Sequence, residues 1–129
     1  GVKDTYFLIE CKSEVNLARV AISKDEAGQM NNHCGWFESE YGKGHNVKRI
    51  LIIPTNVLAT NADFTHEVHV MNDECLTQFK NNFFFFIHEF KGYDLNDMTT
   101  DKIHSFLIAN KLTIEDLKKY YAVHVIREK

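Results

Sequence analysis

The spacing of apolar residues in the first half of the chain predicts a strand, a helix and a second strand. Residues 5–12 are rich in aromatic and β-branched residues, which is typical of a strand. Residues 23–41 carry apolar residues at helical spacing, and they begin with Ser23 and Glu26 at the two positions of a capping box. Residues 47–53 end in a continuous apolar run, which suits a strand that is covered on both faces.

Helical spacing dominates the second half of the chain. Residues 73–91 place a row of leucine, isoleucine and phenylalanine side chains on one face of a predicted helix, with Asp73 as its cap. The run Phe83–Phe86 in this helix is expected to pack in the core, with a dimer face left exposed by truncation as the alternative. Residues 99–121 have the pattern of two short helices in a hairpin, the second of which is capped by Thr113.

The order of these elements predicts an α/β or α+β fold. Residues 55–63 are expected to form a loop, and residues 64–71 are compatible with either a short strand or the start of a helix. The candidate domain boundary lies just after Gly92. We therefore divide the chain into an α/β core in residues 1–92 and a helical extension packed on it in residues 93–129.

Composition and charge exclude several classes of protein. The chain has 129 residues and a formal net charge of −3, so it lacks the overall basic charge of a DNA-coating protein. Its three cysteines are odd in number and widely spaced, which favours a reducing compartment over a disulfide framework. No apolar run reaches 18 residues and no signal peptide is evident, so we expect a cytoplasmic protein without a membrane segment.

The first predicted strand carries a carboxylate and an amine that are suited to chemistry. Because side chains alternate along a strand, Glu10 and Lys12 share one face, while Phe7, Ile9 and Cys11 point the other way, toward the core. A carboxylate can bind a divalent metal through oxygen, and a lysine beside it can orient a water molecule or stabilise charge on a phosphate.

The following helix presents Gln29 and His33 one turn apart on one face. A strand with Glu-x-Lys followed by such a helix resembles the PD-(D/E)xK nuclease superfamily. The segments 22–30 and 36–38 look like a nuclease-type domain found at the C-terminus of some bacterial DEAD/DEAH-box helicases. The resemblance covers residues 5–90 and implies a restriction-endonuclease-like core.

The resemblance also implies roles for individual residues. Glu10 and the backbone carbonyl of Cys11 would bind Mg²⁺ or Mn²⁺. Lys12 would position or activate the attacking water. Gln29 would orient Lys12 or touch the phosphate of the scissile strand, and His33 lies where some members of the superfamily carry a tyrosine.

A second group of basic residues surrounds a glycine-flanked turn. Lys43, His45, Lys48 and Arg49 lie close together in the sequence. We predict that Lys48 and Arg49 contact the substrate backbone, with a solvated loop as the alternative.

One feature departs from the family pattern. The metal-binding aspartate of the family lies on a neighbouring strand, ten or more residues before Glu-x-Lys. Asp4 is the only acidic residue before Glu10, and it lies about 20 Å away along an extended strand. We therefore expect the nuclease-like core to be truncated at its N-terminus.

Three functional hypotheses follow from these residues. The first is a metal-dependent DNA endonuclease-type domain, a phosphodiester hydrolase within a larger helicase or restriction/repair protein, with DNA and the helicase domains of the same chain as partners. The second is a non-catalytic domain with the nuclease fold that binds nucleic acid or another protein. The third is an interaction domain that forms a homodimer through its phenylalanine-rich helix and the open edge of its first strand.

Overall fold

The computed structural model describes residues 4–12 and 20–129. Helices and strands alternate in the first part of the chain, helices follow, and two short strands close it. The elements are β1 (Thr5–Cys11), α1 (Lys24–Tyr41), β2 (Asn46–Ile52), β3 (Val57–Leu58), β4 (His69–Met71), α2 (Asp73–Lys91), a 3₁₀ turn (Leu95–Asp97), α3 (Thr100–Ala109), α4 (Ile114–Tyr121), β5 (Val123–His124) and β6 (Ile126–Arg127).

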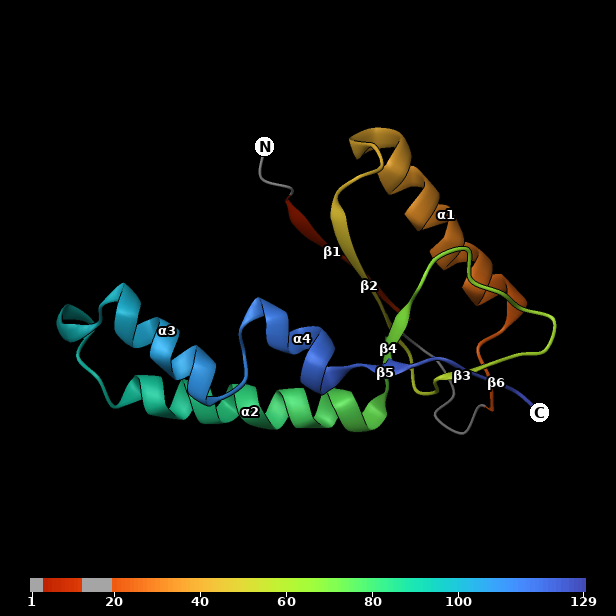
Figure 1. Ribbon diagram of the computed structural model, residues 1–129. Coiled ribbons are helices and arrows are strands. Elements are labelled where there is room, and N and C mark those ends of the chain that lie inside the picture. The colour runs from red at the N-terminus through yellow and green to blue at the C-terminus, as the bar shows by residue number, and fades with distance from the viewer. Residues whose placement is uncertain (1–3, 13–19) are drawn as a thin grey trace.

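A mixed sheet and the helices on its two faces give the molecule an α/β fold. The sheet has the order β1-β2-β4-β5, in which β1, β2 and β4 run parallel and β5 is antiparallel to β4. Helix α1 links the parallel neighbours β1 and β2 and lies along one side of them (Figure 1). Residues 64–71, for which strand and helix were both open, therefore end in a strand, and the predicted loop at 55–63 contains the short strand β3.

Helix α1 forms where the sequence predicts it, because both of its ends are specified locally. The Ser23 side chain accepts a hydrogen bond from the Glu26 backbone at 3.2 Å, and the Glu26 side chain accepts one from the Ser23 backbone at 2.9 Å. The helix ends at Gly42, whose φ of +82° is a conformation that only glycine adopts readily. Its buried face consists of Ala27, Met30, Cys34 and Phe37.

Two hydrophobic clusters fill the two faces of the sheet. On the first face α1 packs over Leu51 and Val70. On the other face α2 and α4 pack over Ile50 and Met71, with Tyr121 of α4 fully buried between them. This two-sided burial explains the continuous apolar run of β2, because neighbouring residues on that strand pack into different clusters.

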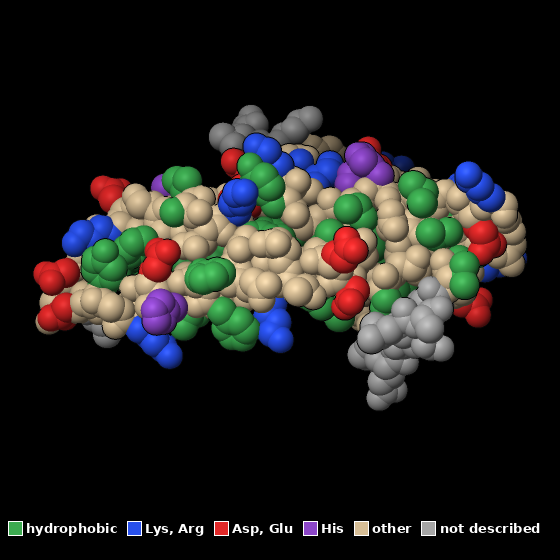
Figure 2. Space-filling model, turned by 90° about the horizontal axis from the view of Figure 1, so that it is seen from below, with side chains coloured by type: hydrophobic (Ala, Val, Ile, Leu, Met, Phe, Trp, Pro, Cys, Tyr) green, Lys and Arg blue, Asp and Glu red, His purple; other side chains and the backbone are tan. Residues whose placement is uncertain are grey.

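Helices α2, α3 and α4 form an arm that extends away from the sheet and makes the molecule elongated (Figure 1). The cap of α2 is Asn72, whose side chain accepts a hydrogen bond from the Cys75 backbone, and not the predicted Asp73. The predicted core packing of the phenylalanine run is wrong for Phe83, Phe84 and Phe85, which are 43%, 57% and 63% exposed. Seen from below, hydrophobic side chains are scattered among charged ones along the whole molecule (Figure 2).

The last residues of the chain return to the sheets. Strand β5 pairs with β4, and β6 pairs in parallel with β3. The sequence pattern indicated helices alone in residues 93–129 and did not indicate these two strands. Their pairing joins that segment to the core by backbone hydrogen bonds.

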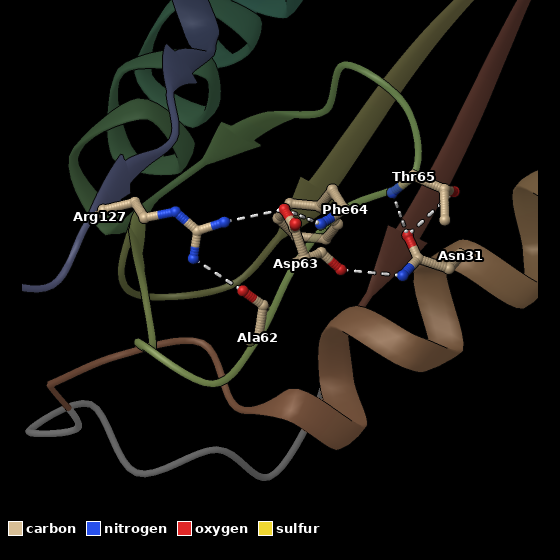
Figure 3. Close-up of polar contacts among 6 residues, drawn as sticks. All are labelled: Asn31, Ala62, Asp63, Phe64, Thr65 and Arg127. Atoms are coloured by element: carbon tan, nitrogen blue, oxygen red, sulfur yellow. Dashed lines mark hydrogen bonds and ion pairs between the residues drawn. The ribbon is translucent and has the colours of Figure 1, made fainter.

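A polar network connects the loop before β4 to the strand β6 on one side and to α1 on the other (Figure 3). The Arg127 guanidinium donates to the Ala62 carbonyl at 2.8 Å and to the Asp63 carboxylate at 2.9 Å. On the other side of the loop, Asn31 of α1 donates to the Asp63 carbonyl and accepts from the Thr65 backbone, both at 2.9 Å. The three segments are thereby fixed relative to one another.

Among the described helices, none combines the length and the apolar character that crossing a membrane requires.

Candidate functional site

Glu10 and Lys12 lie at the carboxyl end of β1 and face α1. Glu10 is in register with Leu51, which packs beneath that helix. The Lys12 Nζ atom lies 2.7 Å from the Glu10 Oε1 atom, and the two side chains are only 15% and 10% exposed. The predicted common face of these two residues is therefore confirmed, and the pair is shielded from water well enough for its charges to interact strongly.

Helix α1 brings two further side chains to this pair. Lys12 donates a hydrogen bond to the Gln29 Oε1 atom. The His33 Nδ1 atom lies 3.1 Å from the Glu10 Oε2 atom. Gln29 and His33 are four residues apart and so face the same way on the helix. We call Glu10, Lys12, Gln29 and His33 the Glu-Lys site.

The backbone of Cys11 faces the open edge of β1. The Lys12 N–H donates to the Ile52 carbonyl of β2, and successive residues of a strand point their backbone groups to opposite sides. Within the described sheet β1 is the edge strand, so the Cys11 carbonyl accepts no ladder hydrogen bond there. It is the second oxygen, after the Glu10 carboxylate, that the resemblance assigns to a metal.

The other face of β1 is less buried than its sequence predicts. Phe7 packs partly into the second cluster, as expected. Ile9 is 50% exposed and the Cys11 side chain is exposed, so their predicted core positions are wrong. The reason is that α2 and α4 cover the sheet over β2 and β4, and β1 lies beyond them.

Lys48 and Arg49 point to opposite faces of the sheet, because they are neighbours on β2. Arg49 is opposite Leu8 on the α1 face. Lys48 lines a cleft of about 700 Å³ on the other face, together with His69 and His124. The structure therefore does not bring the two residues together in one patch, and only Arg49 shares a face with Glu10.

Arg49 lies beneath α1, next to Cys34. Burial raises the pKa of the Cys34 thiol above its ordinary value, and the nearby Arg49 guanidinium opposes that shift. The Arg49 Nε atom is buried and has no hydrogen-bond partner among the described residues. The Arg49 guanidinium thus places a positive charge on the sheet, beneath the helix that carries Gln29 and His33.

The Glu-Lys site has limited capacity for a metal ion. The Glu10 Oε2 atom is buried and accepts no hydrogen bond from the described residues, despite the nearby His33 ring. In the described part of the chain, no three His, Cys, Asp or Glu side chains are grouped to hold a metal. Asp4 precedes the first residue of β1, and its carboxylate contacts the Tyr6 hydroxyl at 3.4 Å. A donor set of one carboxylate and one carbonyl suits Mg²⁺ or Mn²⁺ only when water and phosphate oxygens complete the shell.

A second histidine contact on α1 was not evident in the sequence. The His66 Nε2 atom lies 2.5 Å from the Glu38 Oε1 atom, and its Nδ1 atom lies 2.8 Å from the Thr65 hydroxyl. Glu38 and His66 are 28 residues apart, so no local spacing could have indicated the pair. It fixes the loop after β3 against the C-terminal end of α1.

No protein-family model, curated protein or solved structure matches this chain.

Proposed function

We propose that this chain is a domain of the PD-(D/E)xK type, with a restriction-endonuclease-like core, that hydrolyses DNA phosphodiesters with Mg²⁺ or Mn²⁺. The observation that carries the proposal is the convergence of Glu10, Lys12, Gln29 and His33 at the end of one strand. The sequence resemblance named these four positions from residue types and spacing alone. Their contact in three dimensions is a separate property, and it supports a common role.

The chemistry assigns a different task to each side chain. Lys12 has three N–H donors and uses them on Glu10 and Gln29. When one of these N–H groups turns away from Glu10 or Gln29, it can hold the attacking water molecule in line with the phosphorus atom. Gln29 positions the Lys12 amine, and His33, which is 55% exposed, can donate to a phosphate oxygen of the bound strand.

The Oε2 atom of Glu10, which lies beside His33, and the Cys11 carbonyl are the oxygens that would hold the metal ion. A metal ion held there would supply Lewis-acid polarisation of the phosphate and would lower the pKa of a bound water. The contact between Lys12 and Glu10 limits the negative charge of the site, which favours an ion held partly by the substrate itself.

The experiment measures cleavage of plasmid DNA and of labelled oligonucleotides, using the protein with any residues that its gene encodes upstream of Gly1. With Mg²⁺ or Mn²⁺ the wild-type protein is expected to cleave. Lys12→Ala is expected to lower the rate by about 10²- to 10⁴-fold, the usual contribution of a positioned proton-transfer group. Lys102→Ala, on the distant helix α3, is the matched control and should cleave at the wild-type rate.

Equal rates for the wild type and Lys12→Ala would refute the assignment. Absence of cleavage by the wild type with either metal would favour the alternative function, a non-catalytic domain that binds nucleic acid or another protein. The specific observation behind that alternative is the Glu10–Lys12 ion pair, which can serve structure alone, beside the absence of a three-ligand group in the described residues.

A further inference from the structure

The outer face of α1 next to the Glu-Lys site carries an exposed tryptophan. Gln29, His33 and Trp36 are spaced by four and three residues, so they lie in one row along the helix. Trp36 is 55% exposed, and its ring makes an edge-to-face approach to the Tyr41 ring at 6.0 Å between centroids. Its exposure contrasts with Phe37, the next residue, which is 6% exposed and belongs to the core.

A second row, about 100° around the helix from the first, is made of small residues. Gly28, Asn32 and Gly35 each precede a member of the first row and have the same spacing. An added Cβ at either glycine would meet no atom within 4 Å. Glycine inside a helix is unfavourable compared with alanine, and neither position needs glycine for packing. Both glycines leave the helix backbone open to a close approach from outside.

The helix residues of this face also carry no fixed charge. Residues 27–37 contain no Asp, Glu, Lys or Arg, and His33 is their only titratable group apart from the buried Cys34. Acidic residues lie on α1 only outside this stretch, at Asp25, Glu26, Glu38 and Glu40. The middle of α1 therefore adds no carboxylate of its own to this face, where the Glu10 carboxylate already lies 3.1 Å from His33.

The face continues directly into the Glu-Lys site. Gln29 and His33 belong to both, and the Glu10 Oε2 atom, on a side chain only 10% exposed, lies beside His33 without a hydrogen-bond partner among the described residues. Trp36 follows His33 by three residues, which is about 4.5 Å along the helix axis.

From these observations we propose that the outer face of α1 binds a single-stranded segment of nucleic acid, and that Trp36 stacks on the base next to the phosphate held at the Glu-Lys site. The proposal rests on the proposed function for the identity of that phosphate and adds the class of substrate. Inside a duplex each base is already stacked on both sides, whereas an unpaired base is free to stack on an aromatic side chain. Trp36 thereby selects single-stranded or locally opened nucleic acid.

Trp36 is the only tryptophan of the chain, so its fluorescence reports on this face alone. The experiment titrates the protein with a 12-nucleotide oligothymidylate in EDTA, so that binding is measured without cleavage. Saturable quenching is expected. A blunt duplex of the same length and an abasic oligomer of equal charge are expected to quench weakly or not at all. Oligouridylate, titrated in parallel, distinguishes RNA from DNA as the preferred strand.

Three variants separate stacking from structure, with binding measured by anisotropy of a labelled oligonucleotide. Trp36→Leu is expected to weaken binding about tenfold, within the range measured for base stacking on an aromatic ring. Trp36→Phe keeps a ring and should stay within a few-fold of the wild type. Phe85→Leu, at a 63% exposed aromatic residue of α2, is the matched control and should bind like the wild type.

Equal quenching by the abasic oligomer would overturn base stacking, and equal quenching by the duplex would overturn the single-strand preference. Unchanged affinity of Trp36→Leu would overturn the proposal and leave this face to a protein partner. Cleavage without quenching would retain the proposed function and remove this inference. Quenching without cleavage in the assay with metal would remove the proposed function and retain this inference.

Discussion

The Glu10 carboxylate contacts a different residue through each of its oxygens. Lys12 lies at Oε1 and His33 at Oε2, and the side chain is only 10% exposed. Burying a carboxylate is costly unless its charge is compensated, so the fold itself needs these partners. The hydrogen bond from Lys12 to Gln29 then couples the end of the strand to the helix.

At the residue scale, the role of Gln29 can be measured separately from that of Lys12. Gln29→Ala removes the acceptor that positions the Lys12 amine, and we expect the rate of metal-dependent cleavage to fall about 10- to 100-fold, because small misplacements of a catalytic group have effects of that size. Gln29→Glu keeps an acceptor and should lose less. Gln78→Ala, an exposed glutamine on α2, is the control. Initial rates equal to the wild type for Gln29→Ala would contradict the positioning role.

Alanine substitutions at Gly35 of α1 and at Gly42, which follows the helix, are expected to change stability in opposite directions. Gly35→Ala adds a Cβ where nothing lies within 4 Å, so we expect the free energy of unfolding to rise by about 1 kcal/mol while oligonucleotide affinity falls. Gly42→Ala places alanine at a φ of +82°, where we expect a loss of about 1 kcal/mol or more. Urea denaturation measures both. A stabilised Gly35→Ala protein with unchanged affinity would show that the face is not a binding surface.

At the scale of elements, the sequence predicted the long ones and missed the short ones. The helix at residues 24–41 and the strands beside it were evident because their caps, glycines and apolar periods are local signals. Strands β5 and β6 have two residues each, which is too short for any period. They exist because the partner strands β4 and β3 offer free backbone groups at the right distance.

The strand β6 depends on the network around Arg127. Arg127→Ala removes the bonds to the Ala62 carbonyl and the Asp63 carboxylate, and we expect a loss of about 1 kcal/mol with faster amide exchange at β3 and β6. Arg127→Lys keeps the charge and one donor and should exchange more slowly than the alanine variant. Native-state hydrogen exchange followed by NMR is the measurement. Unchanged exchange at both strands would show that pairing alone holds β6.

At the scale of the whole molecule, Tyr121 joins the helical arm to the sheet. Its ring is fully buried against Phe79 and Ile50, while its hydroxyl accepts from Asn82 at 2.8 Å and donates to the Lys111 carbonyl at 2.7 Å. The side chain therefore connects α2, the loop before α4 and the sheet through one position.

Tyr121→Phe keeps the ring and deletes the hydroxyl. We expect the free energy of unfolding to fall by about 1 to 3 kcal/mol, because two partly buried partners lose their hydrogen bond. The neighbouring Tyr120→Phe, at a 41% exposed side chain, should change stability by less than about 0.5 kcal/mol. Urea denaturation followed by circular dichroism decides between them, and equal stabilities of the two variants would contradict this role of the hydroxyl.

The cleft on the second face of the sheet predicts a dependence of stability on pH. Burial, and then the positive charge of Lys118, lower the pKa of His69 below its ordinary value, while Glu67 opposes them. His124 and Lys48 add to the lowering. Because the folded protein binds this proton less readily than the unfolded chain, the stabilisation is present above the unfolded pKa of about 6.5 and is lost as the pH falls below it.

The measurement is urea denaturation at pH 7.5 and pH 5.5. His69→Gln should lose less stability between the two values than the wild type does. His104→Gln, an exposed histidine of α3, is the control and should behave like the wild type. Identical losses for the two variants would show that His69 does not carry the effect.

The sequence by itself determined the long elements, the caps of α1 and α4, and which residues of the Glu-Lys site share a face, because each depends on neighbours within one strand or one helix. Alternation puts Glu10 and Lys12 on one face, and a spacing of four puts Gln29 and His33 on another.

Only the tertiary structure decided how these faces meet. The crossover from β1 through α1 to β2 places the helix over the strand and so brings Gln29 to Lys12 and His33 to Glu10. The same packing separates Lys48 from Arg49 and leaves Trp36 exposed. Which side chain is buried depends on what covers it, and that cover comes from residues far away in the chain.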